Sequence, residues 1–406
     1  MDKRWVKFPE VLFFQEGPGV RNTQYTFEGV KLLNVANLVN GKVDISNSDR
    51  FISRDEAYSK YKHFLCDNGD FIVASSGIKV EYIDKKMGFI DESMLPLCMN
   101  TSTIRFKVLN SKELNIRYFM YYLKSRHFKL QLAKQITGSA QLNYGPSHLK
   151  DMCIPIVDIC IQNNIVEILD KIQNIINIYE AKIEKLDILV RARFVEMFGD
   201  PVKNTKGWKV KRLGELSIQI NSGNTPKGGS SVYVDEGIAF FRSQNVWKDR
   251  LEMEDIVYIS NDTHASMKRS SLKNGDILMT KTGRINTENS SLGRAALYVG
   301  EDDKANVNGH VYFIRLKPEV NNKFILRILV SVEYRDLIRS VCVGGIDKRQ
   351  LNKEHIENFP IICPPDGLID KYIELVDHID KSKFEVQKAL DKAQLLFDSL
   401  MQKYFG

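Results

Sequence analysis

The sequence predicts a mixed α+β protein in which two globular units are joined by two long helices. Three observations lead to this prediction: short sequence matches recur in one order at a spacing near 207 residues, strand-length apolar runs occur in each copy, and each copy ends in a long stretch of heptad-spaced apolar residues. A chain of 406 residues has room for two or three domains. We therefore expect an internal repeat with pseudo-twofold symmetry.

The repeat is defined by six matches whose offsets lie between 205 and 209 residues. They pair Pro18 with Pro226, Glu28-Gly29-Val30 with Glu236-Gly237-Ile238, Ile52-Ser53 with Ile259-Ser260, Asn68-Gly69-Asp70-Phe71-Ile72 with Asn274-Gly275-Asp276-Ile277-Leu278, Gln141-Leu142-Asn143 with Gln350-Leu351-Asn352, and Ile154-Pro155-Ile156 with Phe359-Pro360-Ile361. Each match is weak alone, since Asn-Gly-Asp is a common turn. Their shared order indicates a duplication.

The first part of each copy, about 150 residues long, is predicted to be globular. Apolar runs at residues 71–74, 277–280 and 311–314 have strand length and are bounded by Gly, Asn or Asp. Helical stretches are expected at residues 116–132 and 323–338. Each globular unit is therefore predicted to be mixed α/β. The sequence pattern leaves its topology open.

The second part of each copy has ten positions that alternate in steps of four and three, and nine of the ten are apolar in each copy. The first seam runs through Ile165, Leu169, Ile172, Ile176, Tyr179, Ile183, Leu186, Val190, Arg193 and Met197, and the second through Tyr372, Val376, Ile379, Lys383, Val386, Leu390, Ala393, Phe397, Leu400 and Tyr404. A spacing of 3.5 residues over about five heptads is typical of a coiled-coil seam. Gly199 and Gly406 stand where helix C-caps are expected.

Two such helices in one chain are expected to bury their seams on each other as an antiparallel coiled coil. Each helix of about 35 residues would be roughly 50 Å long and would act as a spacer between the globular units. The alternative is that each amphipathic helix packs on its own domain. The predicted domains are residues 1–156 and 201–361, and the predicted spacer helices are residues 157–200 and 362–406.

Positive charge is concentrated outside the two helical stretches. Residues 161–200 and 366–406 each carry a net charge of −2, whereas the whole chain carries +7, so the remaining residues hold the excess of Lys and Arg. This distribution suits a surface that binds a polyanion. The six dispersed cysteines lack Cys-x-x-Cys spacing, which favours reduced thiols in a cytosolic protein. No signal peptide, membrane span or metal-binding motif is expected.

Motifs of the common enzyme classes are absent from the sequence. There is no phosphate loop, dinucleotide-binding glycine fingerprint or nucleophile elbow. The Cys363-Pro364-Pro365-Asp366 segment differs from the Asn-Pro-Pro-aromatic and Asp-Pro-Pro-Tyr motifs of amino-methyltransferases. We therefore expect a binding protein with no catalytic residues.

A duplicated basic module fits a DNA target made of two half-sites, one read by each unit. Direct reading of bases requires Arg, Lys, Asn or Gln side chains that are presented on loops. The candidates in the first unit are Arg21, Asn22, Gln24, Asn37, Ser75, Ser76, Lys79, Gln141 and Tyr144, and those in the second are Lys227, Arg242, Gln244, Asn245, Lys281, Thr282, Arg284, Lys348, Arg349 and Gln350. The residues around Lys79 and Arg284 differ between the copies, which predicts two different half-sites and an asymmetric target.

The chain resembles the specificity subunits of type I restriction–modification enzymes. The segments that carry this resemblance are Gly207-Trp208-Lys209-Val210-Lys211-Arg212-Leu213-Gly214-Glu215, Asn221-Ser222-Gly223-Asn224-Thr225-Pro226, Asn274-Gly275-Asp276-Ile277-Leu278, and Asn358-Phe359-Pro360-Ile361 with the exit to Pro365. The resemblance covers the whole chain. It is strongest from Gly207 onward, because the region around Trp5 has a degenerate form of the opening motif.

This resemblance implies that each globular unit is a target recognition domain and that the helices are conserved spacer regions. Expected partners are double-stranded DNA, two methyltransferase (modification) subunits and the restriction/translocase subunits, with no membrane contact. S-adenosylmethionine, ATP and magnesium are expected on the partner subunits, with no cofactor on this chain. Three alternatives stay open: a specificity module for another type of restriction–methylation enzyme, an enzyme with an unfamiliar active site, and a two-module adaptor that binds no DNA.

Overall fold

Both repeats build the same four-stranded antiparallel sheet in the computed structural model, which describes residues 3–47, 49–135, 142–287 and 289–406. The first sheet has the order β2 (Leu12–Glu16), β11 (Thr103–Val108), β7 (Phe71–Ala74), β9 (Met87–Phe89). The second has the order β15 (Ser217–Ser222), β23 (Val311–Leu316), β19 (Ile277–Thr280), β21 (Ala295–Leu297). The predicted strands and the predicted duplication are confirmed.

A smaller sheet is also built twice. In the first repeat β3 (Val30–Leu33) lies between β10 (Leu97–Met99), which is parallel to it, and β6 (Phe51–Ile52), which is antiparallel. In the second repeat β17 (Ile238–Phe241) pairs in the same way with β22 (Ala305–Val307) and β18 (Val257–Ile259), and β16 (Tyr233–Val234) extends the sheet.

The Glu-Gly match of the two repeats has a backbone reason. Gly29 and Gly237 both have positive φ, at +135° and +155°. A Cβ atom at Gly29 would lie 2.1 Å from the carbonyl oxygen of Ile52, and one at Gly237 would lie 2.5 Å from that of Ile259. Glycine is therefore required at both positions, where the chain enters the small sheet.

The aspartate of the Asn-Gly-Asp match forms an ion pair in both units, which the sequence pattern did not predict. Arg105 on β11 donates to the Asp70 carboxylate at 3.0 Å, and Arg315 on β23 donates to Asp276 at 2.7 Å. Arg105 also donates to the carbonyl oxygen of Leu65 at 2.8 Å. In each unit the pair ties the turn before the central strand to the neighbouring strand.

The stretches predicted as single helices are each two helices. They are α3 (Ile116–Lys124) followed by α4 (Arg126–Gln135), and α9 (Asn322–Leu329) followed by α10 (Val332–Val341). Ser125 and Ser331 occupy the breaks, and their hydroxyl oxygens accept hydrogen bonds from the backbone N–H groups of Phe128 and Tyr334. A serine that caps the next helix ends the preceding one, because it takes an extended backbone conformation.

Each repeat closes through an antiparallel strand pair and then enters a long helix. β1 (Arg4–Lys7) pairs with β13 (Cys153–Ile156), and β14 (Lys209–Arg212) pairs with β26 (Pro360–Cys363). The helices that follow are α6 (Ile159–Phe198) and α12 (Asp366–Phe405). Gly199 ends α6 with φ +76° and a hydrogen bond from its N–H to the Val195 carbonyl oxygen, which confirms its predicted C-cap position.

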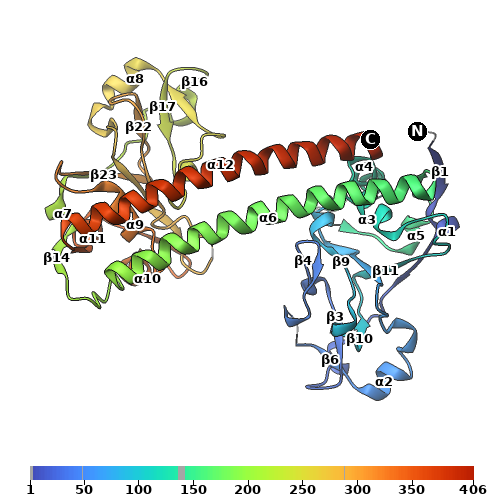
Figure 1. Cartoon of the computed structure of the whole chain (residues 1–406). Helices are drawn as coiled ribbons and strands as arrows, with labels where there is room; N and C mark the ends of the chain where they lie inside the picture. The colour runs from blue at the N-terminus through green and yellow to red at the C-terminus, as the bar shows by residue number, and fades with distance from the viewer. Residues whose placement is uncertain (1–2, 48, 136–141, 288) are drawn as a thin grey trace. The chain divides into compact units, whose positions relative to one another are not determined.

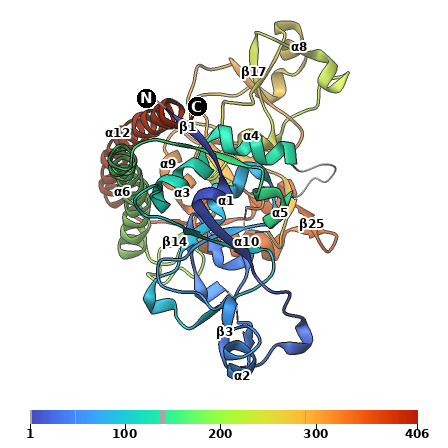
Figure 2. The same cartoon turned by 90° about the vertical axis from the view of Figure 1, so that its right-hand side faces the viewer.

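The chain divides into two units, one formed by residues 1–181 with 387–406 and the other by residues 182–386. Each unit therefore contains a segment of α6 and a segment of α12, which run antiparallel and side by side (Figure 1, Figure 2). In the second unit the Tyr372 hydroxyl, near the start of α12, donates to the Val190 carbonyl oxygen near the end of α6 at 3.3 Å.

The predicted seam residues of both helices are buried or half-buried. Ile165, Leu169, Ile172 and Ile176 share a core cluster with Phe397 and Tyr404, with Leu390, Ala393 and Leu400 packed against it. Val190 shares another with Tyr372, Val376 and Ile379, with Leu186 and Met197 packed against it, and Val386 is buried while Tyr179, Ile183 and Arg193 are half-buried. Lys383, a cation in the seam, is neutralised across it by Asp187 at 2.5 Å. Each seam is thus divided between the cores of the two units.

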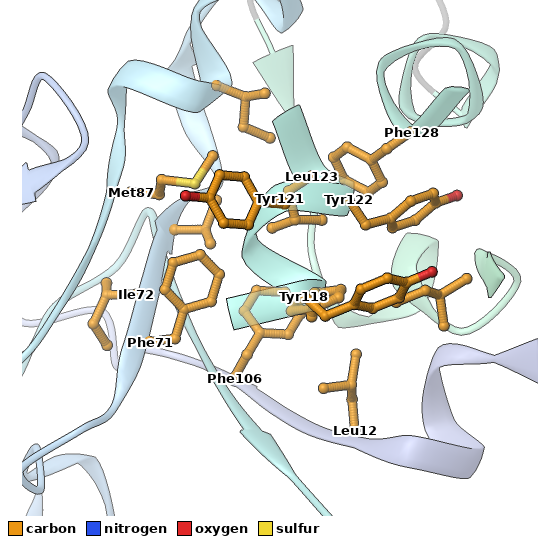
Figure 3. Close-up of a cluster of buried hydrophobic side chains, with 14 of the residues drawn as sticks. Leu12, Phe71, Ile72, Met87, Phe106, Tyr118, Tyr121, Tyr122, Leu123 and Phe128 are labelled. Carbon is orange, nitrogen blue, oxygen red and sulfur yellow. The ribbon is translucent and has the colours of Figure 1, made fainter. Parts of the chain in front are cut away.

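The core of the first unit shows how the helices and the sheet share one set of buried side chains. Phe71, Phe106 and Leu12 from the sheet face Tyr118 and its neighbours on α3 (Figure 3). The Tyr118 ring contacts Phe405 of α12, with 4.9 Å between ring centroids. Since α3 is covered by the sheet on one side and by the long helices on another, the helix pair is part of the globular core.

Candidate nucleic-acid interface

In the second unit, residues that the sequence separates by about 65 positions meet on neighbouring strands. β20 (Thr282–Arg284) pairs antiparallel with β25 (Lys348–Gln350), which also pairs with β24 (Val343–Gly344). Thr282 lies opposite Gln350, and Arg284 lies opposite Lys348. Directly opposed residues on antiparallel strands project to the same face. These four candidate side chains therefore form one polar face, which we call the ribbon face.

The opposite side of this ribbon is covered by the protein. A Cβ atom at Gly283 would lie 2.3 Å from the backbone nitrogen of Leu292, so the chain at residues 290–292 lies against that side. Arg349, the partner of Gly283, points to this covered side and donates to the Cys342 carbonyl oxygen at 3.5 Å. The ribbon face is left accessible, with Arg284, Lys348 and Gln350 exposed and Thr282 half-buried.

The ribbon face carries two cations and one neighbouring carboxylate, so positive charge is in excess. Arg284 and Lys348 are like charges directly opposite each other, an arrangement that destabilises a strand pair. One exposed carboxylate, that of Asp347, reaches Arg284 at 3.2 Å. Nearby, the Lys281 ammonium lies 5.7 Å from the centre of the Tyr312 ring. The geometry suits a polyanion, and a β-ribbon of this kind can enter the major groove of duplex DNA.

The first unit has the corresponding ribbon with different side chains. β8 (Ser76–Ile78) pairs with β12 (Leu142–Asn143), which places Ser76 opposite Asn143. Lys79 follows β8 directly and is exposed. The predicted contact Gln141 lies outside the described residues. The position filled by Arg284 in the second unit thus has no arginine counterpart at the end of β8.

The candidates near the small sheets are partly occupied by internal contacts. Arg242 forms an ion pair with Asp255 at 3.2 Å, and Gln244 donates to the same carboxylate. Gln24 donates to Glu56 and to the Tyr61 hydroxyl, both at 2.9 Å. The remaining candidates of this group are exposed at the surface of the two units: Arg21, Asn22 and Lys227.

Four predicted contact residues are buried and serve the fold instead. Asn37 accepts a hydrogen bond from the Asn34 backbone N–H at 2.9 Å, and Asn245 accepts one from that of Arg242 at 2.9 Å, so both close short helical turns. Ser75 is buried with its hydroxyl 3.3 Å from Glu16. Tyr144 donates to the Ala74 carbonyl oxygen at 3.0 Å, and burial raises the pKa of its phenol. Asn and Ser satisfy buried backbone groups as readily as they contact bases, so residue type alone could not separate the two roles.

Two arginines of the second unit stack on a tryptophan, a contact that the sequence pattern did not predict. The guanidinium carbons of Arg250 and Arg294 lie 5.6 Å and 3.9 Å from the centre of the Trp247 ring. The signal available in the sequence was the run Trp247-Lys248-Asp249-Arg250, which has an aromatic residue and cations in one turn. Arg294 comes from a distant loop and could be placed there only by the fold.

Within the described ranges, no group of His, Cys, Asp and Glu could hold a metal ion, and no helix is long and apolar enough to cross a membrane. The six cysteines are free thiols. Burial raises the pKa of the Cys66 thiol, and it raises that of Cys98 to about 12. Both thiols are therefore protonated and poorly nucleophilic near neutral pH.

Comparison with known proteins gives one consistent family. The family model described as type I restriction modification DNA specificity domain matches twice, at residues 26–187 and 205–393. The MjaVIII and MjaIX type I restriction enzyme specificity subunits of Methanocaldococcus jannaschii are 26% and 23% identical over 45% and 78% of this chain. The chain spans 42% and 74% of the length of these relatives.

Solved structures with the same fold extend the likeness to the whole chain. The type I restriction–modification S subunit from M. genitalium has a TM-score of 0.56 at 16% identity, and the match covers 100% of this chain and 96% of that one. A chain from a structural study of complex assembly and conformational transition in the type I system has a TM-score of 0.53 at 15% identity, covering 99% and 97%.

Proposed function

Because this chain belongs to the type I restriction–modification DNA specificity family, we propose that each of its two units reads one half of a split, asymmetric DNA target. The ribbon face supports this proposal. In the second unit it carries Arg284, Lys348 and Gln350, which are residue types that pair with guanine or adenine edges. The first-unit ribbon has Ser76, Asn143 and Lys79 instead, so the two half-sites should differ.

We further propose that the chain works as the DNA-binding subunit of a larger complex. Two methyltransferase subunits would bind it, and restriction/translocase subunits would join them. S-adenosylmethionine, ATP and magnesium would act on those partners, and this chain would carry out no catalytic step. Its place of action would be the prokaryotic cytoplasm, where the genome is accessible.

Methylome sequencing tests the proposal directly. The chain is expressed with its methyltransferase partner in a host, and the partner alone serves as the control. The expected result is a new split N6-methyladenine motif with two different halves that appears only when both proteins are present. If the two proteins assemble and no motif appears, the proposed function is wrong.

The purified chain alone should transfer no methyl group and cleave no DNA. Methyl transfer from S-adenosylmethionine by the isolated chain would contradict the non-catalytic role. The complex of the chain with its methyltransferase partner should transfer methyl groups. This activity should be lost when the partner is removed and should recover fully when the partner is added back.

A further inference from the structure

The second unit contains a cationic cavity whose lining includes none of the four ribbon-face residues. Its volume is about 390 Å³, within the range of roughly 300–1,000 Å³ that is usual for small-ligand sites. Its walls come from α6, the start of α12, the α9–α10 connection and the loops near residues 248–250 and 290–295. All of these segments belong to the same unit.

Positive charge dominates the lining. Eight Lys or Arg side chains border the cavity, against three Asp or Glu. Two of the acids are already paired, because Asp187 binds Lys383 and Asp249 binds Arg327. Arg294 donates to the carbonyl oxygen of Ser290 at 2.9 Å, so its contacts there are neutral.

Arg250 is paired with Glu252 at 2.6 Å and Arg339 with Asp336 at 3.6 Å. Lys248, Arg294 and Arg335 lie close together and form no ion pair within the described residues. The Nε atom of Arg335 is buried and has no hydrogen-bond acceptor among the described residues. Burial lowers the pKa of Lys248, and the charges of Arg335 and Arg294 lower it further. Burial and the charge of Arg250 likewise lower the pKa of Arg294. An anion in the cavity would relieve both the mutual repulsion and the missing hydrogen bond.

The duplicated fold shows that four of these cations are not needed to build the unit. At the offsets of 206 and 207 that relate the matching helices, Arg191 corresponds to Asp398, Arg327 to Tyr121, Arg339 to Ala133 and Lys383 to Ile176. Arg335 corresponds to Lys129, which is paired with Asp84 at 2.9 Å. The first unit therefore has the same helices with neutral, acidic or compensated residues. At these five positions, the excess of positive charge is found in the second unit.

We propose that this cavity is a phosphate-binding site. Guanidinium groups match the geometry of phosphate oxygens, and a multivalent phosphate compensates several cations at once, which a single carboxylate cannot do. The same chemistry can come from a free phosphorylated molecule or from a DNA phosphodiester. The inference stands independently of base reading by the ribbon face.

The test compares variants of the full chain in two assays. Isothermal titration with sodium pyrophosphate measures the free ligand, and fluorescence anisotropy with a duplex that lacks the target measures the phosphodiester. Arg335→Gln removes the buried guanidinium. Arg339→Ala introduces the residue that the first unit has at the equivalent position, Ala133. This variant is therefore expected to fold, and its loss of binding would not be due to unfolding. Arg269→Gln, on the exposed η9 turn (Lys268–Ser270) outside the cavity, is the matched control for net charge.

Loss of one charge-assisted contact should weaken binding about tenfold or more. Weaker pyrophosphate binding by both cavity variants with an unchanged control assigns the cavity to a free phosphorylated ligand. Weaker duplex binding with an unchanged control assigns it to the DNA backbone. If wild type binds neither probe, or if Arg269→Gln loses as much affinity as the cavity variants, the proposal is overturned. Either of these two results would leave the split methylation motif unchanged. Failure of the phosphate-site proposal can therefore be distinguished from failure of the proposed function.

Discussion

Replacing Arg284 by alanine separates DNA recognition by the second unit from its folding. The side chain is 68% exposed and its partner Asp347 is 58% exposed, with 3.2 Å between Nε and Oδ2. An ion pair this exposed contributes at most about 1 kcal/mol to the free energy of unfolding. A bidentate contact to a base edge is worth about 1–3 kcal/mol of discrimination, which corresponds to roughly 5- to 150-fold in affinity. The variant should therefore fold normally and bind its target more weakly.

The assay uses the half-sites that the methylome defines. Anisotropy is measured on three duplexes: one with both half-sites, one with the first half-site scrambled and one with the second scrambled. Arg284→Ala should lose affinity on duplexes that retain the half-site read by the second unit, and it should match wild type when that half-site is scrambled. Arg269→Ala, another exposed arginine of the same unit, should change all three affinities equally and slightly.

Two results would refute the reasoning about the ribbon face. One is an equal loss for Arg284→Ala on all three duplexes, which would make the residue a non-specific phosphate contact. The other is full affinity on the intact target. Lys79→Ala supplies the reciprocal test, because its effect should depend on the other half-site.

Three further predictions concern the buried ion pair, a histidine and the long helices. Asp70→Ala leaves the Arg105 side chain, which is 7% exposed, without its carboxylate partner, and it should lower the free energy of unfolding by about 3–5 kcal/mol. The control Asp67→Ala removes a carboxylate that is 70% exposed and should lower the free energy of unfolding by less than about 1 kcal/mol. Equal losses in chemical denaturation would contradict the assigned burial. Partial burial lowers the pKa of His127, whose ring lies 4.6 Å from that of Trp5. The folded protein then binds this proton less readily than the unfolded chain, so its contribution to stability is complete above pH 6.5 and is lost as the pH falls; an NMR titration of His127 with a midpoint at or above 6.5 would argue against it. Deleting residues 176–182 together with 383–389 removes one matched heptad from each helix and should change the number of base pairs between the methylated half-sites, and a folded variant that methylates with the original gap would disprove a spacer role for the helices.

The recurring patterns of the sequence were sufficient for the architecture. The 3.5-residue spacing from Ile165 onward is a property of neighbouring residues on one helix, so it predicted the seam before any partner was known. The collinear matches predicted the duplication, and the sheets of the two units confirmed it. The end of α6 at Gly199 could also be predicted from a local property, because it depends on one residue that tolerates positive φ.

Side-chain roles were decided by tertiary structure. Asn245 and Gln350 have the same base-reading chemistry in the sequence, but the fold buries one in a turn and leaves the other on the ribbon face. The break at Ser331 and the salt link between Asp276 and Arg315 likewise depend on neighbours across the unit.

The sequence by itself therefore determined the duplication, the long helices and the strands, because these follow from periodicity and from local backbone preference. Only the tertiary structure decided which polar groups face solvent and which cations gather in one cavity. The physical reason is that burial and electrostatic fields arise between residues far apart in the chain, such as Arg284 with Lys348 or Lys248 with Arg335.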